Sequence, residues 1–396
     1  MADKPKRRWL PRIRFSLRTL LFVVLLIGSG TALWLHWNPW RLVRELQMPK
    51  QIINCAEFSP DGRYIVTPHD DKLARIFNAD TGELVRELSG HTARLVSATY
   101  SPDGTKIITS GNRDAMTNGN WDRTTRIWDA QTGKQLRVLP DAQGYPSIGI
   151  SPDGKTIATV NVKIGVIQFW DFMGENPVGQ TALPIGTAGV TFSPDSKRLV
   201  NSYAAFHDKP DPVITFDVES GLQLRTIDGY VNTYMTYSPD GQKLLMCNQS
   251  KDGSRIFDAE SGTLIAFLEH SNNWAARYSP DGRRIATAGS GVIKIWDAET
   301  HSLLAQMRGP AGIYLSFSPD GTRMAIAHRE GVQIWQRERP EFRWGVLMLP
   351  ELWCTVLLAC ALIWSLCRDR KDNRLTQDPT PPRGVAKDNP DSPNTR

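Results

Sequence analysis

The chain has few of the residues that build disulfide frameworks and metal sites. Its 396 residues include five cysteines and seven histidines, and the histidines occur singly. Cys354, Cys360 and Cys367 lie in one apolar run near the C-terminus, whereas Cys55 and Cys247 lie in separate parts of the chain. This spacing fits neither a disulfide framework nor a set of metal ligands. We therefore expect no structural disulfides, no metal site and no cofactor.

Short motifs of enzyme active sites are also missing. The sequence contains no Gly-x-Ser-x-Gly elbow, no phosphate-binding glycine-rich loop followed by lysine, no His-Glu-x-x-His pair and no calcium-binding loop. These absences argue against the hydrolase, nucleotide-binding, metalloprotease and calcium-binding classes that use those motifs. We predict that the chain is not an enzyme.

An excess of charge of one sign is confined to the first 18 residues. These residues carry seven basic side chains and one acidic one, so their net charge equals the +6 of the whole chain. The rest of the chain is therefore balanced. A nucleic-acid surface needs basic residues clustered in the folded domain, so we expect no nucleic-acid partner.

One tetrapeptide, Ser-Pro-Asp-Gly, recurs along the chain. It starts at Ser59, Ser101, Ser151, Ser238, Ser279 and Ser318, and a near-copy starts at Ser193. The seven starts are 42, 50, 42, 45, 41 and 39 residues apart. Such a period indicates one supersecondary unit repeated seven times. Each copy lies between two short apolar runs, and Pro, Asp and Gly all favour tight turns, so we predict a β-hairpin around each.

A second motif accompanies the first. Its clearest copy is Arg126-Ile-Trp128-Asp129-Ala-Gln-Thr-Gly133, which predicts a third strand that ends on a buried aromatic residue and a polar turn into a fourth strand. Similar segments are Arg75–Gly82, Arg255–Gly262 and Lys294–Thr300, and weaker ones are Phe169–Asp171, Thr215–Asp217 and Ile334–Trp335.

Seven units of four strands resemble the tryptophan–aspartate (WD) repeat family, and in particular its bacterial membrane-anchored members. The resemblance covers residues 41–337 and implies an all-β, seven-bladed β-propeller. A chance β-sandwich would not explain seven paired motifs. A related propeller class, found in periplasmic translocation proteins and prolyl peptidases, shares the Ser-Pro-Asp-Gly turn. The aromatic-Asp-Ala-x-Thr-Gly turns favour the WD type.

The resemblance also implies a hydrogen-bond set inside the second unit, formed by His91, Ser110, Asp122 and Trp128. These four residues are expected to be structural, although their types suit catalysis. The other units lack the Gly-His pair of this unit, so their blades are expected to depend more on apolar packing.

The pentapeptide Leu42–Leu46 recurs without change at Leu84–Leu88, where it follows a Thr-Gly turn and is expected to form a fourth strand. No such strand follows Trp335. We therefore predict that residues 42–46 supply the fourth strand of the last blade and close the ring, which removes two open sheet edges. The alternative is a linker with a chance match.

Two apolar runs flank the repeats. Thr19–Trp37 has no charged side chain, and Trp344–Cys367 has one. We predict transmembrane helices over residues 19–39 and 344–367, because about 20 apolar residues span the hydrocarbon core. A cleaved signal peptide is the alternative for the first run, and a buried soluble helix for the second. The tail, residues 368–396, is poor in apolar residues and is expected to be disordered.

The basic residues before the first run place both termini in the cytoplasm and the propeller outside it. Both anchors would leave the propeller on the face of the Ser-Pro-Asp-Gly turns, and that face is expected to look toward the bilayer. A propeller in the cytoplasm remains an alternative.

Candidate partner-binding residues lie on the opposite face. An insertion of about eight residues, Gly111–Trp121, produces the longest spacing between turns, and loops on rigid scaffolds often carry specificity. Arg113 and Trp121 in this loop are residue types common at interface hot spots. The remaining candidates precede or begin first strands near this face, and they are Arg94, Tyr145 and Trp274.

These observations predict a membrane-anchored, non-catalytic scaffold that binds proteins. The main alternative is a propeller with a ligand-binding or hydrolytic site at its central funnel. A converging set of acids or histidines at equivalent positions of neighbouring units would favour that alternative, and none is recognisable in the sequence.

Overall fold

A computed structural model describes most of the repeat region. The described residues are 39–48, 53–111, 122, 124–140, 148–161, 165–174, 177–182, 187–203, 211–230, 234–247, 253–312 and 314–338. Residues 38–339 form one compact unit, and a second unit comprises 1–37 and 340–396. The tail and both expected transmembrane helices lie outside the described residues, except for Pro39, which is not helical and directly precedes the first strand. Within the described ranges, no helix has the length and apolar character needed to cross a bilayer.

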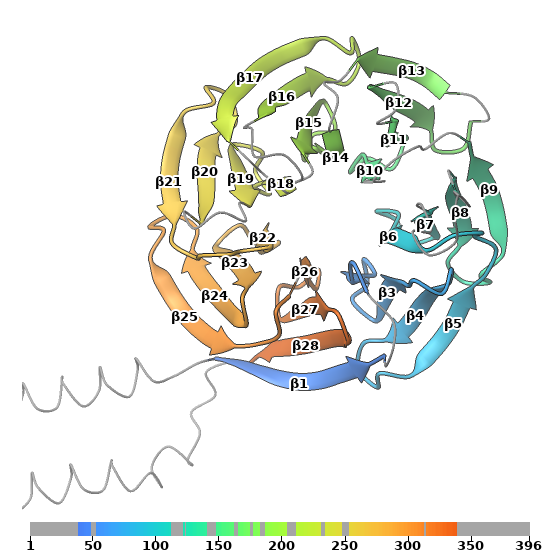
Figure 1. The fold of residues 1–396 in the computed structure, drawn as a ribbon, viewed down its shortest axis with the longest axis horizontal. Coiled ribbons are helices and arrows are strands. Elements are labelled where there is room, and N and C mark those ends of the chain that lie inside the picture. Colours follow the sequence, from blue (N-terminus) through green and yellow to red (C-terminus); the bar gives the residue numbers. More distant parts are fainter. Residues whose placement is uncertain are drawn as a thin grey trace, which may run out of the picture. The chain divides into compact units, whose positions relative to one another are not determined.

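The described strands form seven antiparallel sheets of four strands each, arranged in a ring (Figure 1). The predicted all-β, seven-bladed propeller is therefore confirmed. In six blades the strands follow one another in sequence from the centre outward.

The strands of the first four blades are as follows. Blade 1 has β2 (Glu57–Phe58), β3 (Tyr64–Pro68), β4 (Ala74–Asn78) and β5 (Leu84–Leu88); blade 2 has β6 (Leu95–Tyr100), β7 (Lys106–Gly111), β8 (Thr125–Asp129) and β9 (Gln135–Leu139). Blade 3 has β10 (Gly149–Ile150), β11 (Thr156–Asn161), β12 (Val166–Asp171) and β13 (Pro177–Ala182); blade 4 has β14 (Thr187–Phe192), β15 (Arg198–Tyr203), β16 (Asp211–Asp217) and β17 (Gln223–Tyr230).

The remaining three blades complete the ring. Blade 5 has β18 (Tyr234–Tyr237), β19 (Lys243–Cys247), β20 (Ser254–Asp258) and β21 (Leu264–Leu268); blade 6 has β22 (Ala275–Tyr278), β23 (Arg284–Gly289), β24 (Val292–Asp297) and β25 (Leu303–Arg308). Blade 7 has β26 (Tyr314–Phe317), β27 (Arg323–His328), β28 (Gly331–Arg337) and, from the other end of the domain, β1 (Trp40–Gln47).

Each Ser-Pro-Asp-Gly segment joins the first and second strands of a blade and satisfies its own polar groups. In all seven turns the serine hydroxyl donates to the aspartate Oδ1 at 2.5–2.6 Å. The same carboxylate accepts a backbone N–H two residues later, as from Arg63 at 3.0 Å. The last turn residue has positive φ, and Ser196 in the near-copy adopts φ 62° where the other turns have glycine. The repeated sequence therefore produces a repeated, internally bonded turn.

The Ser-Pro-Asp-Gly turns and the turns between third and fourth strands lie at the same face of the ring. In every blade, the N–H of a residue at or just after the end of the third strand donates to the carbonyl of the residue four after the turn serine, as from Ala79 to Arg63 at 2.8 Å. We call the face formed by these turns the turn face. The opposite strand ends, where each second strand leads to the third and each blade to the next, form the other face, which we call the loop face.

The core lies between neighbouring sheets. The buried cluster between blades 7 and 1 combines Leu46, Ile65, Phe77 and Ile334. The cluster between blades 1 and 2 combines Ile76, Leu88, Leu95 and Trp128. Because each blade buries its face only against its neighbours, the ring must be complete for every blade to be covered.

Closure of the ring follows the prediction. β1 pairs with β28, with Leu42 opposite Trp335 and Leu46 opposite Val332. The strand extends beyond the predicted residues 42–46 at both ends. The chain enters and leaves the propeller at one point, because the N–H of Glu338 donates to the carbonyl of Pro39 at 2.7 Å.

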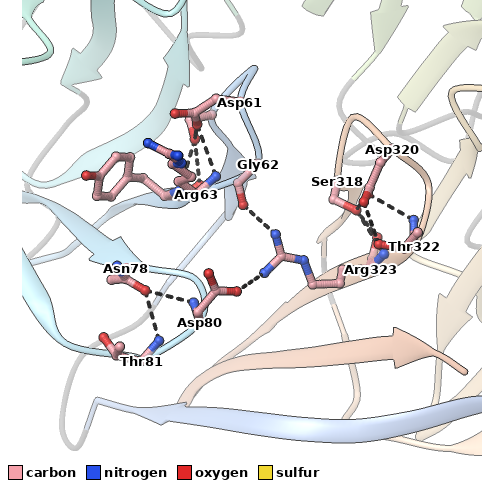
Figure 2. A network of polar contacts seen from close by, with 12 residues as sticks. Asp61, Gly62, Arg63, Asn78, Asp80, Thr81, Ser318, Asp320, Thr322 and Arg323 are labelled. Atoms are coloured by element: carbon pink, nitrogen blue, oxygen red, sulfur yellow. Dashed lines mark hydrogen bonds and ion pairs between the residues drawn. The ribbon is translucent and has the colours of Figure 1, made fainter.

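Polar contacts also seal the seam between blades 7 and 1 (Figure 2). The Arg323 guanidinium reaches across it, with Nη1 donating to Asp80 Oδ1 at 2.6 Å and Nη2 donating to the Gly62 carbonyl at 2.7 Å. The arginine therefore connects the second strand of the last blade to both turns of the first.

Candidate functional site

The first strands of the blades surround the centre of the ring (Figure 1). Their side chains form a charged cluster there. A cavity of about 450 Å³ is lined by residues that include Glu57, Arg277 and Tyr314, from blades 1, 6 and 7. Tyr234 and Thr99, from blades 5 and 2, line the same cavity. Side chains far apart in sequence therefore meet because each occupies the innermost strand of its blade.

Hydrogen bonds connect these side chains into one network. The Tyr314 hydroxyl donates to Glu57 Oε1 at 2.7 Å, and Thr99 donates to Glu57 Oε2 at 2.9 Å. Arg277 Nη2 donates to the Tyr314 hydroxyl at 3.2 Å, and its guanidinium lies 5.1 Å from the centre of the Tyr314 ring. The Tyr234 and Tyr314 rings meet edge to face at 6.4 Å. Tyr314 thus bridges the positive and the negative group.

The electrostatics of the cluster favour binding over proton transfer. Burial, reinforced by the Glu57 charge, raises the pKa of the Tyr314 hydroxyl well above its usual value. Burial alone would lower the pKa of Arg277, but Tyr314 and Glu57 raise it overall. Burial also raises the pKa of the Cys55 thiol to about 12, so this lining residue is not a thiolate nucleophile at neutral pH.

The sequence analysis did not predict this cluster, because its members are not acids or histidines at equivalent positions of neighbouring blades. The signal is the residue two before each turn serine, which lies on the first strand. Most blades carry a small or hydroxyl-bearing residue there, whereas blades 1 and 6 carry Glu57 and Arg277. Tyr314 stands four before its turn serine, at the position that Tyr234 occupies in blade 5.

The hydrogen-bond set of blade 2 differs from the expected one at one residue. His91 Nδ1 and Asp122 Oδ2 are 2.8 Å apart, and His91 Nε2 and Thr109 Oγ1 are also 2.8 Å apart. Trp128 Nε1 donates to the same Thr109 hydroxyl at 2.7 Å. Ser110 instead bonds Thr125 at 2.9 Å. Successive residues of a strand point to opposite faces, so Thr109 and not Ser110 connects the histidine to the tryptophan.

Thr109 belongs to a position that several blades use in the same way. It lies eight residues after the turn serine, and the equivalent Thr159 and Thr287 accept hydrogen bonds from Trp170 and Trp296, both at 2.9 Å. Blades 3 and 6 therefore keep the tryptophan–threonine hydrogen bond of this set although they lack the Gly-His pair of blade 2.

The predicted partner-binding residues are only partly described. Arg113, Trp121 and Tyr145 lie outside the described residues. Arg94 is half-buried before β6, and the next residue donates its N–H to the His69 carbonyl at 3.0 Å. Trp274 precedes β22, is 41% exposed, and donates its N–H to the Ala288 carbonyl. Both residues are on the loop face, but they belong to blades 2 and 6 and form no continuous patch.

Metal binding has no candidate residues in the described ranges, where no three His, Cys, Asp or Glu side chains come close enough to hold an ion.

Comparisons with known proteins give matches of two kinds. A family model described as "WD domain, G-beta repeat" matches residues 40–78, 82–129 and 262–297. The chain is similar to the serine-threonine kinase receptor-associated protein of Homo sapiens, with 24% identity over 208 residues, or 52% of this chain and 54% of that protein. The protein of the same name from Dictyostelium discoideum is 26% identical over 196 residues, 48% of this chain and 61% of that protein.

A further similarity is to protein tipD of Dictyostelium discoideum, 25% identical over 211 residues, or 52% of this chain and 32% of that protein. The chain spans about half the length of the first curated relatives it matches, 54% for the human protein. These relatives are eukaryotic, so the bacterial membrane-anchored type remains a hypothesis.

Proposed function

We propose that this chain, a WD40-repeat β-propeller, is a membrane-anchored scaffold that binds protein partners on its loop face and catalyses no reaction. WD40 propellers are typically protein-interaction scaffolds. The observation that carries the choice of face is the contrast between the two faces of the ring.

The turn face repeats one self-satisfied turn seven times, so it offers little variation for recognising a partner. The loop face carries segments of differing length, and it exposes Trp274. A large aromatic side chain on a rigid loop is a common anchor at interfaces. These features support the loop face as the partner surface.

The anchoring is proposed from the two apolar runs, 19–37 and 344–367, together with the single point at which the described chain enters and leaves the propeller. With the positive-inside rule, the propeller lies outside the cytoplasm and its loop face points away from the bilayer.

Photo-cross-linking in intact cells tests the partner face. A photoreactive amino acid at position 274 is compared with one at position 222, because Leu222 is on the turn face and is 66% exposed. We expect a discrete protein adduct from position 274 and none from position 222. With the identified partner purified, Trp274→Ala weakens binding by about 2 kcal/mol or more, roughly thirtyfold, whereas Leu222→Ala leaves it unchanged. Adducts from position 222 alone, or equal losses for both variants, defeat the proposal.

The topology is tested by labelling Ser290→Cys, an exposed position on the loop face, with a membrane-impermeant maleimide. Labelling of intact cells is expected. Labelling only after permeabilisation places the propeller in the cytoplasm and contradicts the proposed orientation.

A second candidate function is the binding of a small polar ligand in the central cavity. The observation that favours it is the network of Glu57, Tyr314 and Arg277 on the cavity wall. Glu57 is already bonded through both oxygens, so Arg277 is the group best placed to recognise a carboxylate. Succinate should raise the melting temperature of the wild-type chain saturably and not that of Arg277→Gln. An Arg323→Gln control should respond like the wild type, and equal responses of all three proteins exclude the cavity.

A further inference from the structure

The outermost strand of every blade contains a β-bulge near its start, one residue after the first residue in blades 1–6 and three residues after it in β1. In each case one residue of the fourth strand has no partner in the third strand, whereas the residues before and after it are paired. The skipped residue is aliphatic in all seven blades and 42–68% exposed. The seven residues are Val43, Val85, Leu136, Val178, Leu224, Ile265 and Leu304. A bulge re-aims the side chain at its position, and here it turns seven aliphatic side chains to the outer rim.

The residue before the bulge breaks the sevenfold symmetry. It is leucine in blades 5, 6, 7 and 1, where Leu264, Leu303, Leu42 and Leu84 are 39–49% exposed. In blades 2, 3 and 4 the residue before the bulge is Gln135, Pro177 or Gln223. Two adjacent exposed aliphatic side chains therefore occupy four consecutive blades, whose outer strands β21, β25, β1 and β5 follow one another around the rim (Figure 1). Blades 2 and 4 also expose two aliphatic side chains each, Leu136 with Val138 and Leu222 with Leu224, but in each pair one residue separates the two.

We call the eight side chains of these four blades the apolar arc. They are Leu264, Ile265, Leu303, Leu304, Leu42, Val43, Leu84 and Val85. Exposed aliphatic residues are ordinary when they occur singly, whereas adjacent pairs repeated at one position of neighbouring blades suggest an interaction surface.

The arc includes the place where the chain enters the propeller. Blade 7 contributes β1, which begins beside Pro39, and Pro39 is bonded to Glu338 where the chain leaves. Fourth strands start at the turn face, so the arc lies on the rim nearest that face. The apolar run that ends at Trp37 stops three residues before β1, a reach of roughly 10 Å at most.

Charge marks the limits of the arc. Glu45 and Glu87 are exposed two residues beyond the bulges of blades 7 and 1, so acidic side chains bound the apolar band there on the side of the loop face. The equivalent residues are Gln306 in blade 6 and Phe267 in blade 5, where the exposed ring extends the band. On the other side stands Arg41, exposed and paired with Glu338 at 3.0 Å. A basic side chain at the start and acids farther along are the order expected for a strand that touches a lipid interface at its first residues.

We propose that the apolar arc rests in the interfacial region of the lipid bilayer, so that the propeller leans on the membrane through blades 5, 6, 7 and 1. This inference rests on the proposed membrane anchoring. The short tether brings the arc to a lipid surface, and burial of its side chains at the boundary of headgroups and acyl chains removes apolar area from water. Blades 2, 3 and 4, with polar or proline residues before their bulges, then face away from the lipid.

Site-specific fluorescence with the full chain in vesicles tests the proposal. The five native cysteines are replaced by alanine, single cysteines are introduced, and each is labelled with an environment-sensitive probe. The arc variants are Val43→Cys, Val85→Cys and Leu304→Cys. The matched controls are Val178→Cys and Leu224→Cys, which stand at the same bulge in blades 3 and 4 and are more exposed than the arc positions. The vesicles contain phosphatidylcholine, phosphatidylglycerol and a lipid spin-labelled near its headgroup.

We expect the spin-labelled lipid to quench the arc probes several-fold more than the control probes. Equal quenching at all five positions, in chains that resist carbonate extraction, contradicts the proposed contact between the arc and the bilayer. Resistance to carbonate would still support the membrane anchoring. Release of the chain by carbonate contradicts the anchoring itself. Arc probes that escape lipid quenching but cross-link to a second copy of the chain overturn the proposal in favour of self-association.

Discussion

Blades 1 and 7 are neighbours that share the pentapeptide Leu-Val-Arg-Glu-Leu in their outermost strands but acquire it differently. In blade 1, a short turn joins β4 to β5. In blade 7, β1 comes from the opposite end of the domain. The registers are nevertheless equivalent, with Leu84 opposite Phe77 and Leu42 opposite Trp335, each followed by a bulged valine. The same five residues therefore form the same strand whether the partner is near or far in sequence, and only the covalent connection differs.

The two blades also share a histidine ten residues after the turn serine, in different surroundings. His69 of blade 1 is fully buried and lies 2.8 Å from the Thr67 hydroxyl through Nε2. His328 of blade 7 is half-buried, with Glu45 3.8 Å away. Equivalent positions of the repeat can therefore differ in electrostatics, because the neighbouring side chains differ.

The largest expected effect comes from truncating the last leucine of each pentapeptide. Leu46 and Leu88 are both buried between sheets, so Leu46→Ala and Leu88→Ala should each lower the free energy of unfolding by about 2–5 kcal/mol. In Leu46→Ala, β1 should also open locally, because no turn holds it beside β28. In Leu46→Ala, the β1 and β28 amides should then exchange hydrogen faster than the rate set by global unfolding. In Leu88→Ala, the β5 amides should exchange at the same rate as the rest of the domain. Identical exchange patterns in the two variants would show that the covalent turn is unimportant.

An intermediate effect concerns pH. Burial, with a smaller contribution from the Arg75 charge, lowers the pKa of His69 to about 4. Protonation of His69 is therefore less favourable in the folded state than in the unfolded state. The contribution of the neutral His69 to the free energy of unfolding is complete above the ordinary histidine pKa of about 6.5 and declines as the pH falls below that value. Burial also lowers the pKa of His328, but Glu45 and Glu330 oppose that shift.

Denaturant titrations at two pH values measure this difference. Between about pH 7 and pH 5, the wild type should lose about 1–2 kcal/mol more stability than His69→Gln. His328→Gln should change the pH dependence less. The lowered pKa values of His91 and His270 contribute in all these proteins, so only the difference between them is informative. If the stability of His69→Gln depended on pH in the same way as that of the wild type, His69 would not be a source of the pH dependence.

The smallest effect is expected at the seam. Arg323→Ala removes a partly exposed ion pair with Asp80, and such pairs contribute about 1 kcal/mol or less. Its comparison is Arg198→Ala, which removes an ion pair with Glu260 at the seam between blades 4 and 5. Combined with Leu46→Ala, the Arg323 change should be non-additive and the Arg198 change additive, because only the former lies at the same seam. Equal interaction free energies between Leu46→Ala and each arginine variant would show that Arg323 does not contribute specifically to closing the ring.

Most of the fold could be predicted from the sequence, because the turn chemistry is local and repeated. The Ser-Pro-Asp-Gly segments identify the hairpins, and the second copy of Leu84–Leu88 identifies the closing strand. The bridging role of Thr109 could not be predicted, for a different reason. A shift of one residue along a strand reverses the face, and the sequence alone did not fix which of Thr109 and Ser110 points inward.

The central cluster could not be predicted in the same way. Glu57, Arg277 and Tyr314 meet because three blades converge on one axis, and no local pattern links them. Their positions relative to the turn serines would have suggested a shared location once the ring was assumed. Their hydrogen bonds depend on distances between blades, which only the folded structure supplies.

The dependence of blade 7 on β1 sets an order of events during synthesis. β1 leaves the ribosome before any of its partners, and β28 is completed about 290 residues later. At 5–20 residues per second, translation takes roughly 15–60 seconds to deliver the partner. During that interval β1 is an unpaired edge, open to pairing with the wrong strand. Completion of the ring is thus the last step of folding, and it cannot precede the end of translation of the repeat region.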